Sequence, residues 1–209
     1  MLIKGEKMAV FFEPWVGVNY NEGGIFRKKI LVIGNSHYCG DRNSCQRCGV
    51  ENESLYTGKD CKDFTKTIIN TYLDYQESKC EYEGWMKTFS NFEKALNDKN
   101  SSEDIWNSIS FYNYLQVAVP NDGDKTNSNK TYNRYYDDYC KSEDCLWSVI
   151  SDLKPDCIIV WGRIVWNHIG YRIEGETGIL TKYIRHPSMG FSIIRWHQEL
   201  SECFGSGNS

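Results

Sequence analysis

Ile30-Leu31-Val32-Ile33-Gly34-Asn35-Ser36-His37-Tyr38 is the stretch of sequence that decides the fold. Its first four residues form a continuous apolar run, which is typical of a strand buried on both faces of a sheet. The run stops at a glycine, and polar side chains follow at once. In open α/β sheets, ligands bind in the crevice outside the carboxyl ends of the strands. The stretch therefore predicts a central parallel strand followed by a ligand-binding loop.

A second polar loop, His186-Pro187-Ser188, lies near the other end of the chain and follows the apolar pair Tyr183-Ile184. Two of the four histidines of the chain sit in these two loops. The other two, His168 and His197, fall in predicted helices, where we expect structural or surface roles. The pattern favours one cleft built from the two ends of the chain.

The rest of the sequence alternates between strand and helix patterns. Residues 8–20 are aromatic-rich and indicate an extended lead-in to the sheet. We expect strands at 29–33, 110–119, 157–161 and 180–184, and helices at 60–78, 84–96, 101–108, 132–153, 163–169 and 193–204. This order predicts a parallel sheet with helices on both faces. The expected fold is one α/β domain over residues 1–209, a three-layer α/β/α arrangement around a mainly parallel four-stranded sheet.

Composition narrows the class of protein. The chain has 209 residues, of which 40% are hydrophobic and 25% charged, as in globular domains with one core. It contains no apolar run long enough to span a membrane and no N-terminal signal pattern, so we expect a cytoplasmic monomer. The net charge of −4 predicts no global basic surface for nucleic acid. Local basic groups, each also readable as ordinary solvated surface, are Arg27-Lys28-Lys29, Arg42 with Arg47, and Arg185 with Arg195.

Nine cysteines without a secretion signal argue against a disulfide framework. Four of them gather in a Cys-rich loop, residues 39–61: Cys39, Cys45, Cys48 and Cys61. Four thiolates are the ligand set of a structural zinc ion, and an iron–sulfur cluster is the alternative. Free thiols in a reducing cytosol are the other interpretation. Cys157 lies in an apolar strand, where we expect it to be a core residue.

Polar residues or glycine follow each predicted strand, and this layout resembles the uracil-DNA glycosylase superfamily from about Ile30 to Leu200. The first motif of that family, Gly-Gln-Asp-Pro-Tyr or Gly-Met-Asn-Pro-Gly, stands here as Gly34-Asn35-Ser36-His37-Tyr38. An asparagine on a middle strand is matched by Asn113, and an apolar-apolar-glycine strand end by Ile159–Gly162. The last motif, His-Pro-Ser, is unchanged at His186–Ser188.

The resemblance implies that the protein flips a damaged or modified pyrimidine out of single- or double-stranded DNA and hydrolyses its N-glycosidic bond. His186 would stabilise the negative charge that grows on the leaving base. Asn113 would pair with the edge of the base. The other catalytic candidates are Asn35, Ser36 and His37. The candidates for stacking on the base are Tyr38, Phe111 and Tyr112. The candidates for contacting the DNA, two of them as wedges, are Arg185, Ser188, Met189 and Phe191.

The first motif departs from the family at the residue that orients the attacking water. The family's aspartate is replaced by Ser36, which cannot act as a carboxylate, and His37 would have to be neutral to serve as a base. Candidate substitutes in the Cys-rich loop are Asp41, Glu51 and Glu53. Two alternatives therefore stay open. One is a catalytically silent nucleic-acid- or nucleotide-binding protein that retains the fold, and the other is an interaction module stabilised by a metal in the Cys-rich loop.

Overall fold

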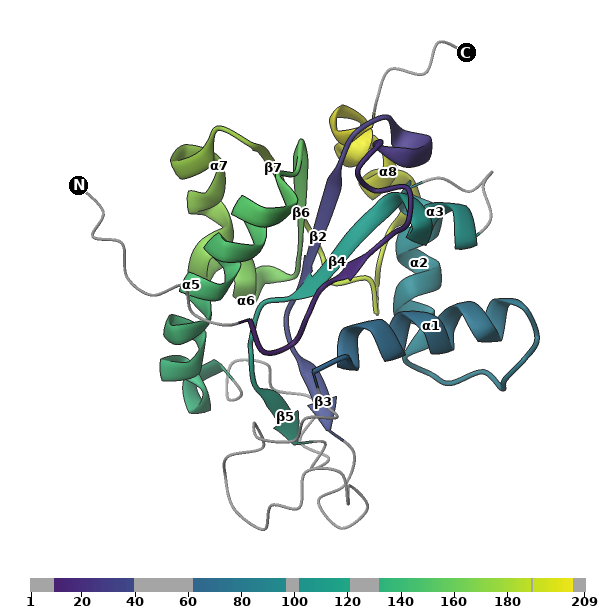
Figure 1. Cartoon of the computed structure of the whole chain (residues 1–209), viewed down its shortest axis with the longest axis horizontal. Helices are drawn as coiled ribbons and strands as arrows, with labels where there is room; N and C mark the ends of the chain where they lie inside the picture. The colour runs from purple at the N-terminus through teal and green to yellow at the C-terminus, as the bar shows by residue number, and fades with distance from the viewer. Residues whose placement is uncertain (1–9, 40–61, 97–101, 121–131, 189, 205–209) are drawn as a thin grey trace.

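The structure is a computed structural model that describes residues 10–39, 62–96, 102–120, 132–188 and 190–204 (Figure 1). Its main sheet has the order β1-β4-β2-β6-β7. The strands are β1 (Trp15–Val16), β2 (Ile30–Gly34), β4 (Ile109–Asn113), β6 (Cys157–Trp161) and β7 (Leu180–Ile184). The last four are mutually parallel, whereas β1 pairs antiparallel with β4. The mainly parallel sheet is thus confirmed, but it has five strands because part of the predicted lead-in joins it as an edge strand.

Helices cover both faces of this sheet, as the alternating strand and helix patterns predicted. One layer contains α1 (Phe64–Gln76), α2 (Met86–Leu96), α3 (Ser102–Ser108) and α8 (Ile193–Leu200). The other contains α5 (Tyr136–Leu153), α6 (Arg163–Val165), the π-helical segment η3 (Trp166–Gly170) and α7 (Tyr171–Thr177). Short 3-10 segments are η1 (Gly24–Phe26) and η4 (Ser201–Cys203). Figure 1 shows α5, α6 and α7 on one side of the strands and α1, α2 and α8 on the other.

The apolar run of β2 explains why helices cover both faces of the sheet. Side chains alternate between the two faces of a strand. Ile30 and Val32 pack into the core beneath α1, α2 and α8, while Leu31 and Ile33 pack into the core beneath α5, α6 and α7. All four side chains are fully buried. A strand with this pattern can only be central, and it has β4 on one side and β6 on the other.

The strand predicted at 110–119 is in fact two strands in two sheets. After β4 the chain turns, and β5 (Ala118–Pro120) pairs in parallel with β3 (His37–Cys39) in a separate small sheet. The turn is held by the buried side chain of Gln116. Its Nε2 donates to the carbonyl oxygen of Asn113 at 2.9 Å, and its Oε1 accepts from two backbone N–H groups of the lead-in at 2.9 Å each. The prediction of one continuous strand was wrong because the apolar pattern persists through this buried turn.

The helix predicted at 163–169 continues through η3 and α7 to Thr177. Gly170, a residue that often marks the end of a helix, lies inside it. A Cβ at this position would come within 2.9 Å of the Trp166 ring and 3.4 Å of both Val160 methyl groups. The glycine therefore serves close packing of the helix against β6 rather than termination. No helix of the described ranges is long and apolar enough to cross a membrane.

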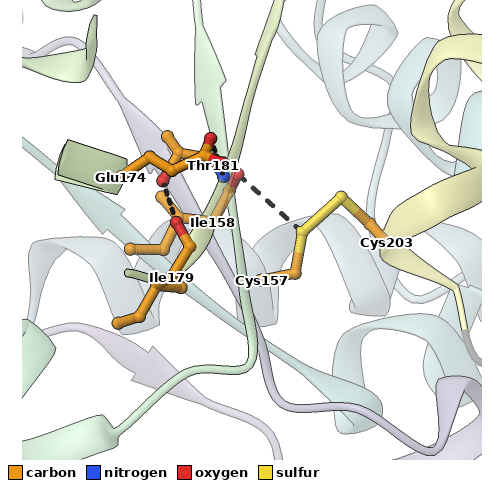
Figure 2. The surroundings of a disulfide bond; sticks show 6 residues. All are labelled: Cys157, Ile158, Glu174, Ile179, Thr181 and Cys203. Carbon is orange, nitrogen blue, oxygen red and sulfur yellow. Dashed lines mark hydrogen bonds between the residues drawn. A yellow bond between two sulfur atoms is a disulfide. The ribbon is translucent and has the colours of Figure 1, made fainter. Parts of the chain in front are cut away.

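Cys157 is fully buried at the start of β6, as predicted for a core residue. It forms a disulfide with Cys203 of η4, across a sequence separation of 46 residues (Figure 2). The cysteine pattern did not indicate this bond. The disulfide ties the C-terminal segment to the amino end of β6, at the opposite end of that strand from Gly162.

Candidate functional site

The topology singles out the carboxyl end of β2. The chain leaves β2 to form β4 on one side and later returns to form β6 on the other side. Such a reversal of strand order is where open α/β sheets bind their ligands, because connections run away from it in both directions. Residues 34–36 follow β2 at this point, Gly162 follows β6, and residues 185–188 follow the neighbouring β7. The sheet thus brings both predicted loops to one edge.

Asn113 ends β4 directly beside Gly34, its register partner on β2. A Cβ on Gly34 would lie 2.2 Å from Asn113 Oδ1, so the amide fills the space that a side chain would need. Asn113 Nδ2 lies 3.1 and 3.2 Å from the two ring nitrogens of His37. Only 7% of Asn113 is exposed. The close approach of Gly34 and the ring of His37 together fix this amide.

His37 is itself a buried residue. Its Nε2 lies 2.9 Å from Thr65 Oγ1 of α1, and its ring packs against Phe12 and Phe64 with centroids 4.8 and 4.6 Å away. Burial lowers its pKa from 6.5 to about 3, so the ring is neutral at physiological pH. The neutral state is the one that a base requires. However, the ring is only 3% exposed and contacts the Asn113 amide, so its place in the fold is that of a support for Asn113.

Asn35 and Ser36 stand at the point where the strand order reverses, and both are half-buried. Asn35 Oδ1 accepts a hydrogen bond from the phenol of Tyr139 on α5 at 2.6 Å. Ser36 Oγ is buried and has no hydrogen-bond partner in the described part of the chain. A buried hydroxyl without a partner costs roughly 1–3 kcal/mol. That cost is removed when a ligand or water atom binds there.

The second loop places His186 beside the end of β6. A Cβ on Gly162, whose φ is +85°, would lie 3.6 Å from His186 Cβ. His186 Nδ1 lies 3.1 Å from Ser188 Oγ. The side chain of Asn91 on α2 holds the loop, because its Nδ2 donates to the carbonyl oxygens of Pro187 at 2.7 Å and Ser188 at 3.4 Å. His186 reaches solvent, yet the protein atoms around it lower its pKa through desolvation.

Two aromatic rings connect the loops. Phe111 Cζ would lie 2.9 Å from a Cβ on Gly34, and its ring centroid is 5.0 Å from that of Trp161. The Trp161 ring is in turn 6.0 Å from the His186 ring, nearly perpendicular to it. Trp161 Nε1 is buried and lacks a partner among the described residues. Asn113, Gly34 and His186 are therefore linked by a short series of contacts across β4, β2 and β6.

Other predicted residues lie apart from this series. Tyr112 is fully buried on the opposite face of β4, in the core beneath α5, because it neighbours Phe111 along the strand. Tyr38 on β3 is 54% exposed. Phe191 is half-buried and stacks on Trp196, with centroids 6.1 Å apart. Arg185 and Ser188 are exposed. Tyr38 is thus the stacking candidate that a ligand could reach most freely.

Several predictions lie outside the described residues: Asp41, Cys45, Cys48, Glu51, Glu53, Cys61 and Met189. Cys39 ends β3, but its side chain is not described. Within the described ranges, no three His, Cys, Asp or Glu side chains come together as a metal would require. Metal binding by the Cys-rich loop stays a prediction.

Arg42 and Arg47 lie outside the described residues, and most of the other predicted basic groups lie away from the site. Residues 27–29 precede β2 and so stand at the amino edge of the sheet. Arg195 lies 4.9 Å over the Trp196 ring and 4.0 Å from the Glu199 carboxylate. Of these basic residues, Arg185 alone directly follows a carboxyl strand end within the described ranges.

Three supporting residues carry no signal in the sequence: Thr65, Asn91 and Tyr139. Each reaches the site from a helix of another layer, and none belongs to a motif. Only their tertiary partners single them out. Comparison with known families and with curated proteins finds no match to this chain.

Proposed function

We propose that this chain is a DNA glycosylase of the uracil-DNA glycosylase type. It flips a damaged or modified pyrimidine out of DNA and hydrolyses the N-glycosidic bond, in DNA repair or in defence against modified phage DNA. One observation carries the proposal. Gly34–Ser36, Asn113 and His186 stand at one edge of a parallel sheet, where the strand order reverses. The resemblance of the motifs requires such an arrangement.

The leaving base needs a hydrogen-bond donor, and His186 supplies it in this proposal. Its lowered pKa favours the neutral ring at physiological pH. When Ser188 Oγ donates to Nδ1, the ring proton is on Nε2, which becomes the donor. A fixed donor of this kind is worth about 3 kcal/mol of barrier in comparable oxyanion sites. The contacts from Asn91 to the loop keep the ring in place.

Residues 34–38 contain no carboxylate that could hold the attacking water. Ser36 Oγ is the candidate, since its unpartnered hydroxyl can both donate to and accept from a water molecule. A weak nucleophile is sufficient when the sugar already has oxocarbenium character. We assign His37 to the support of Asn113 rather than to proton transfer, because it is buried and bonded on both sides.

The test offers the protein single- and double-stranded DNA that contains uracil, 5-hydroxymethyluracil or a modified cytosine. Abasic sites are detected as strand breaks after alkali. We expect release of at least one of these bases, and we expect His186→Gln and Asn113→Ala to lower the rate by about 100-fold, the effect of one lost donor in comparable sites. His197→Gln is the matched control, because His197 lies on α8 and bonds the carbonyl oxygen of Ala95. If no base is released from any of these substrates, the proposed glycosylase activity is refuted.

A catalytically silent nucleic-acid- or nucleotide-binding protein is the second candidate. The absence of a carboxylate from residues 34–38 and the burial of His37 favour it. DNA binding without base release would support this candidate. In that case, the His186 and Asn113 substitutions would change the dissociation constant alone, as measured by fluorescence anisotropy.

A further inference from the structure

We infer that Tyr139 is a positioning residue that fixes the amide of Asn35, so that Asn35 Nδ2 donates a hydrogen bond to a carbonyl oxygen of the bound base. The inference rests on the proposed function. It starts from one contact, in which the phenol oxygen of Tyr139 lies 2.6 Å from Asn35 Oδ1.

The distance identifies the atoms of the amide. A separation of 2.6 Å is typical of O–H···O bonds, whereas N–H···O bonds cluster near 2.9–3.0 Å. Burial raises the pKa of Tyr139 well above its ordinary value, so the phenol keeps its proton and can donate it. Oδ1 is therefore the acceptor. Nδ2, a double donor, is left without a hydrogen bond in the described part of the chain.

Both sides of this contact are rigid. The Tyr139 side chain is fully buried, and its ring lies 4.9 Å from that of Tyr132 and 5.9 Å from that of Tyr114. The Tyr114 phenol also donates to the carbonyl oxygen of Tyr139 at 2.8 Å. The backbone of Asn35 is held by Leu115, whose N–H donates to the Asn35 carbonyl at 2.9 Å. A rotation of the amide by 180° would break the hydrogen bond that the Tyr139 phenol donates to Oδ1.

The chemistry of the edge suits a donor at this position. Residues 34–38 and 185–188 contain no Asp or Glu, and the polar groups that they offer include Asn35 Nδ2, Ser36 Oγ and the His186 ring. Pyrimidine carbonyl oxygens are acceptors only. A base that enters where the strand order reverses would meet the amide of Asn35 next to Ser36. Asn35 then contributes binding to the base, and Ser36 is left to hold the water.

Two substitutions test whether the side chain of Asn35 acts as a donor or as an acceptor toward the base. Asn35→Asp keeps an oxygen to accept from Tyr139 but removes the N–H groups. Tyr139→Phe keeps the ring and removes the hydroxyl. Tyr20→Phe is the matched control, because Tyr20 is also a fully buried tyrosine, with its hydroxyl 3.4 Å from the Leu153 carbonyl oxygen, away from the site.

Base release is measured on a single-stranded oligonucleotide with one uracil, and the side-chain amide resonance of Asn35 is followed by ¹⁵N NMR. We expect both site variants to raise KM by about ten-fold or more, the loss of one hydrogen bond in a desolvated site, with a smaller change in kcat. Tyr20→Phe should stay within about two-fold. In the wild type, the Asn35 resonance should move with the uracil oligonucleotide and not with an all-adenine counterpart, because adenine has no carbonyl oxygen. In Tyr139→Phe this movement should be lost.

Opposite results overturn the inference in distinct ways. An Asn35→Asp variant as active as the wild type would mean that Asn35 acts as an acceptor. A Tyr139→Phe variant equal to Tyr20→Phe would reduce Tyr139 to a packing residue. In both cases base release by the wild type would keep the proposed function intact. If the wild type releases no base from DNA with uracil, 5-hydroxymethyluracil or a modified cytosine, and its Asn35 resonance does not change with any of these substrates, both the proposed function and the inference fail.

Discussion

Acid should destabilise the folded protein through His37. The ring is buried between Phe12 and Phe64 and bonded to Thr65 and Asn113, so a proton on it would be a buried charge without a counter-ion among these contacts. In the unfolded chain the same ring takes up a proton near pH 6.5. In the folded protein the ring does not take up that proton until the pH approaches 3. The stability that His37 contributes is therefore present above pH 6.5 and lost as the pH falls toward 3.

The size of the effect follows from the shift. A pKa lowered from 6.5 to about 3 is worth about 5 kcal/mol in total, at 1.36 kcal/mol for each unit. Most carboxyl groups titrate at the lower end of this window, so the upper end is the cleaner range. Between pH 6.5 and pH 5, His37 alone should cost about 2 kcal/mol of unfolding free energy.

Urea unfolding of the wild type and His37→Gln, at intervals from pH 7.5 to pH 5, isolates this contribution. His168 and His186 also have pKa values lowered by burial, but they are present in both proteins and cancel in the difference. The wild type should lose about 2 kcal/mol more than the variant over this range. Parallel pH profiles for the two proteins would refute the reasoning and would mean that His37 accepts its proton in the folded state.

Three further perturbations test the packing of the site and of the helical layer that contains α2. Gly34→Ala should lower the unfolding free energy, measured by thermal unfolding, by about 1–3 kcal/mol, because the new methyl group overlaps the Asn113 amide. Gly84→Ala is the control and should change stability by less than about 1 kcal/mol, because the space around it is open. Equal effects of the two substitutions would contradict this account. Asn91→Ala should lower the unfolding free energy by about 1 kcal/mol and should also lower kcat for base release. An unchanged kcat would exclude a role of Asn91 in holding the loop of residues 185–188. Glu93→Leu should lower the unfolding free energy, measured in urea, by about 3 kcal/mol or more, because the buried Glu93 side chain accepts hydrogen bonds from Tyr72, Ser102 and Trp106. A loss of less than about 1 kcal/mol would refute that account.

Strands buried on both faces were the predictable part of the fold. β2 and β6 coincide with the expected strands to within one residue, because continuous apolar runs between polar or glycine residues have few other interpretations. β7 also coincides with its expected range, although its side chains are only partly buried. β1 is a two-residue edge strand, too short to give a periodic signal. The separation of β4 from β5 depends on the hydrogen bonds of one buried glutamine, Gln116, to groups distant in the sequence. No local pattern encodes those bonds.

The position of the candidate site could be predicted from the sequence, but most of its contacts could not. The ends of parallel strands share one edge, so Ser36, Asn113 and His186 could be expected there from their position alone. The burial of His37 could not, because it depends on Phe12 and Phe64 from two distant segments. The supporting bonds from Tyr139 and Asn91 likewise depend on how helices of the two outer layers pack. Such contacts follow from the completed fold.

Unpartnered polar atoms give an independent reason to place a ligand at this edge. Four buried side-chain atoms lack a hydrogen-bond partner in the described part of the chain: Ser36 Oγ, Tyr112 Oη, Trp161 Nε1 and His168 Nε2. Ser36 follows β2, Tyr112 and Trp161 lie in the last two residues of β4 and β6, and His168 is in the helix that starts after β6. Folded proteins leave few such groups unpaired, and each costs roughly 1–3 kcal/mol. Tyr112 lies in the core beneath α5, and His168 packs against the tyrosine rings on the same side of the sheet, so these two atoms say nothing about a ligand. Ser36 and Trp161 lie at the carboxyl ends of β2 and β6, where a bound polar ligand would remove the cost of both atoms.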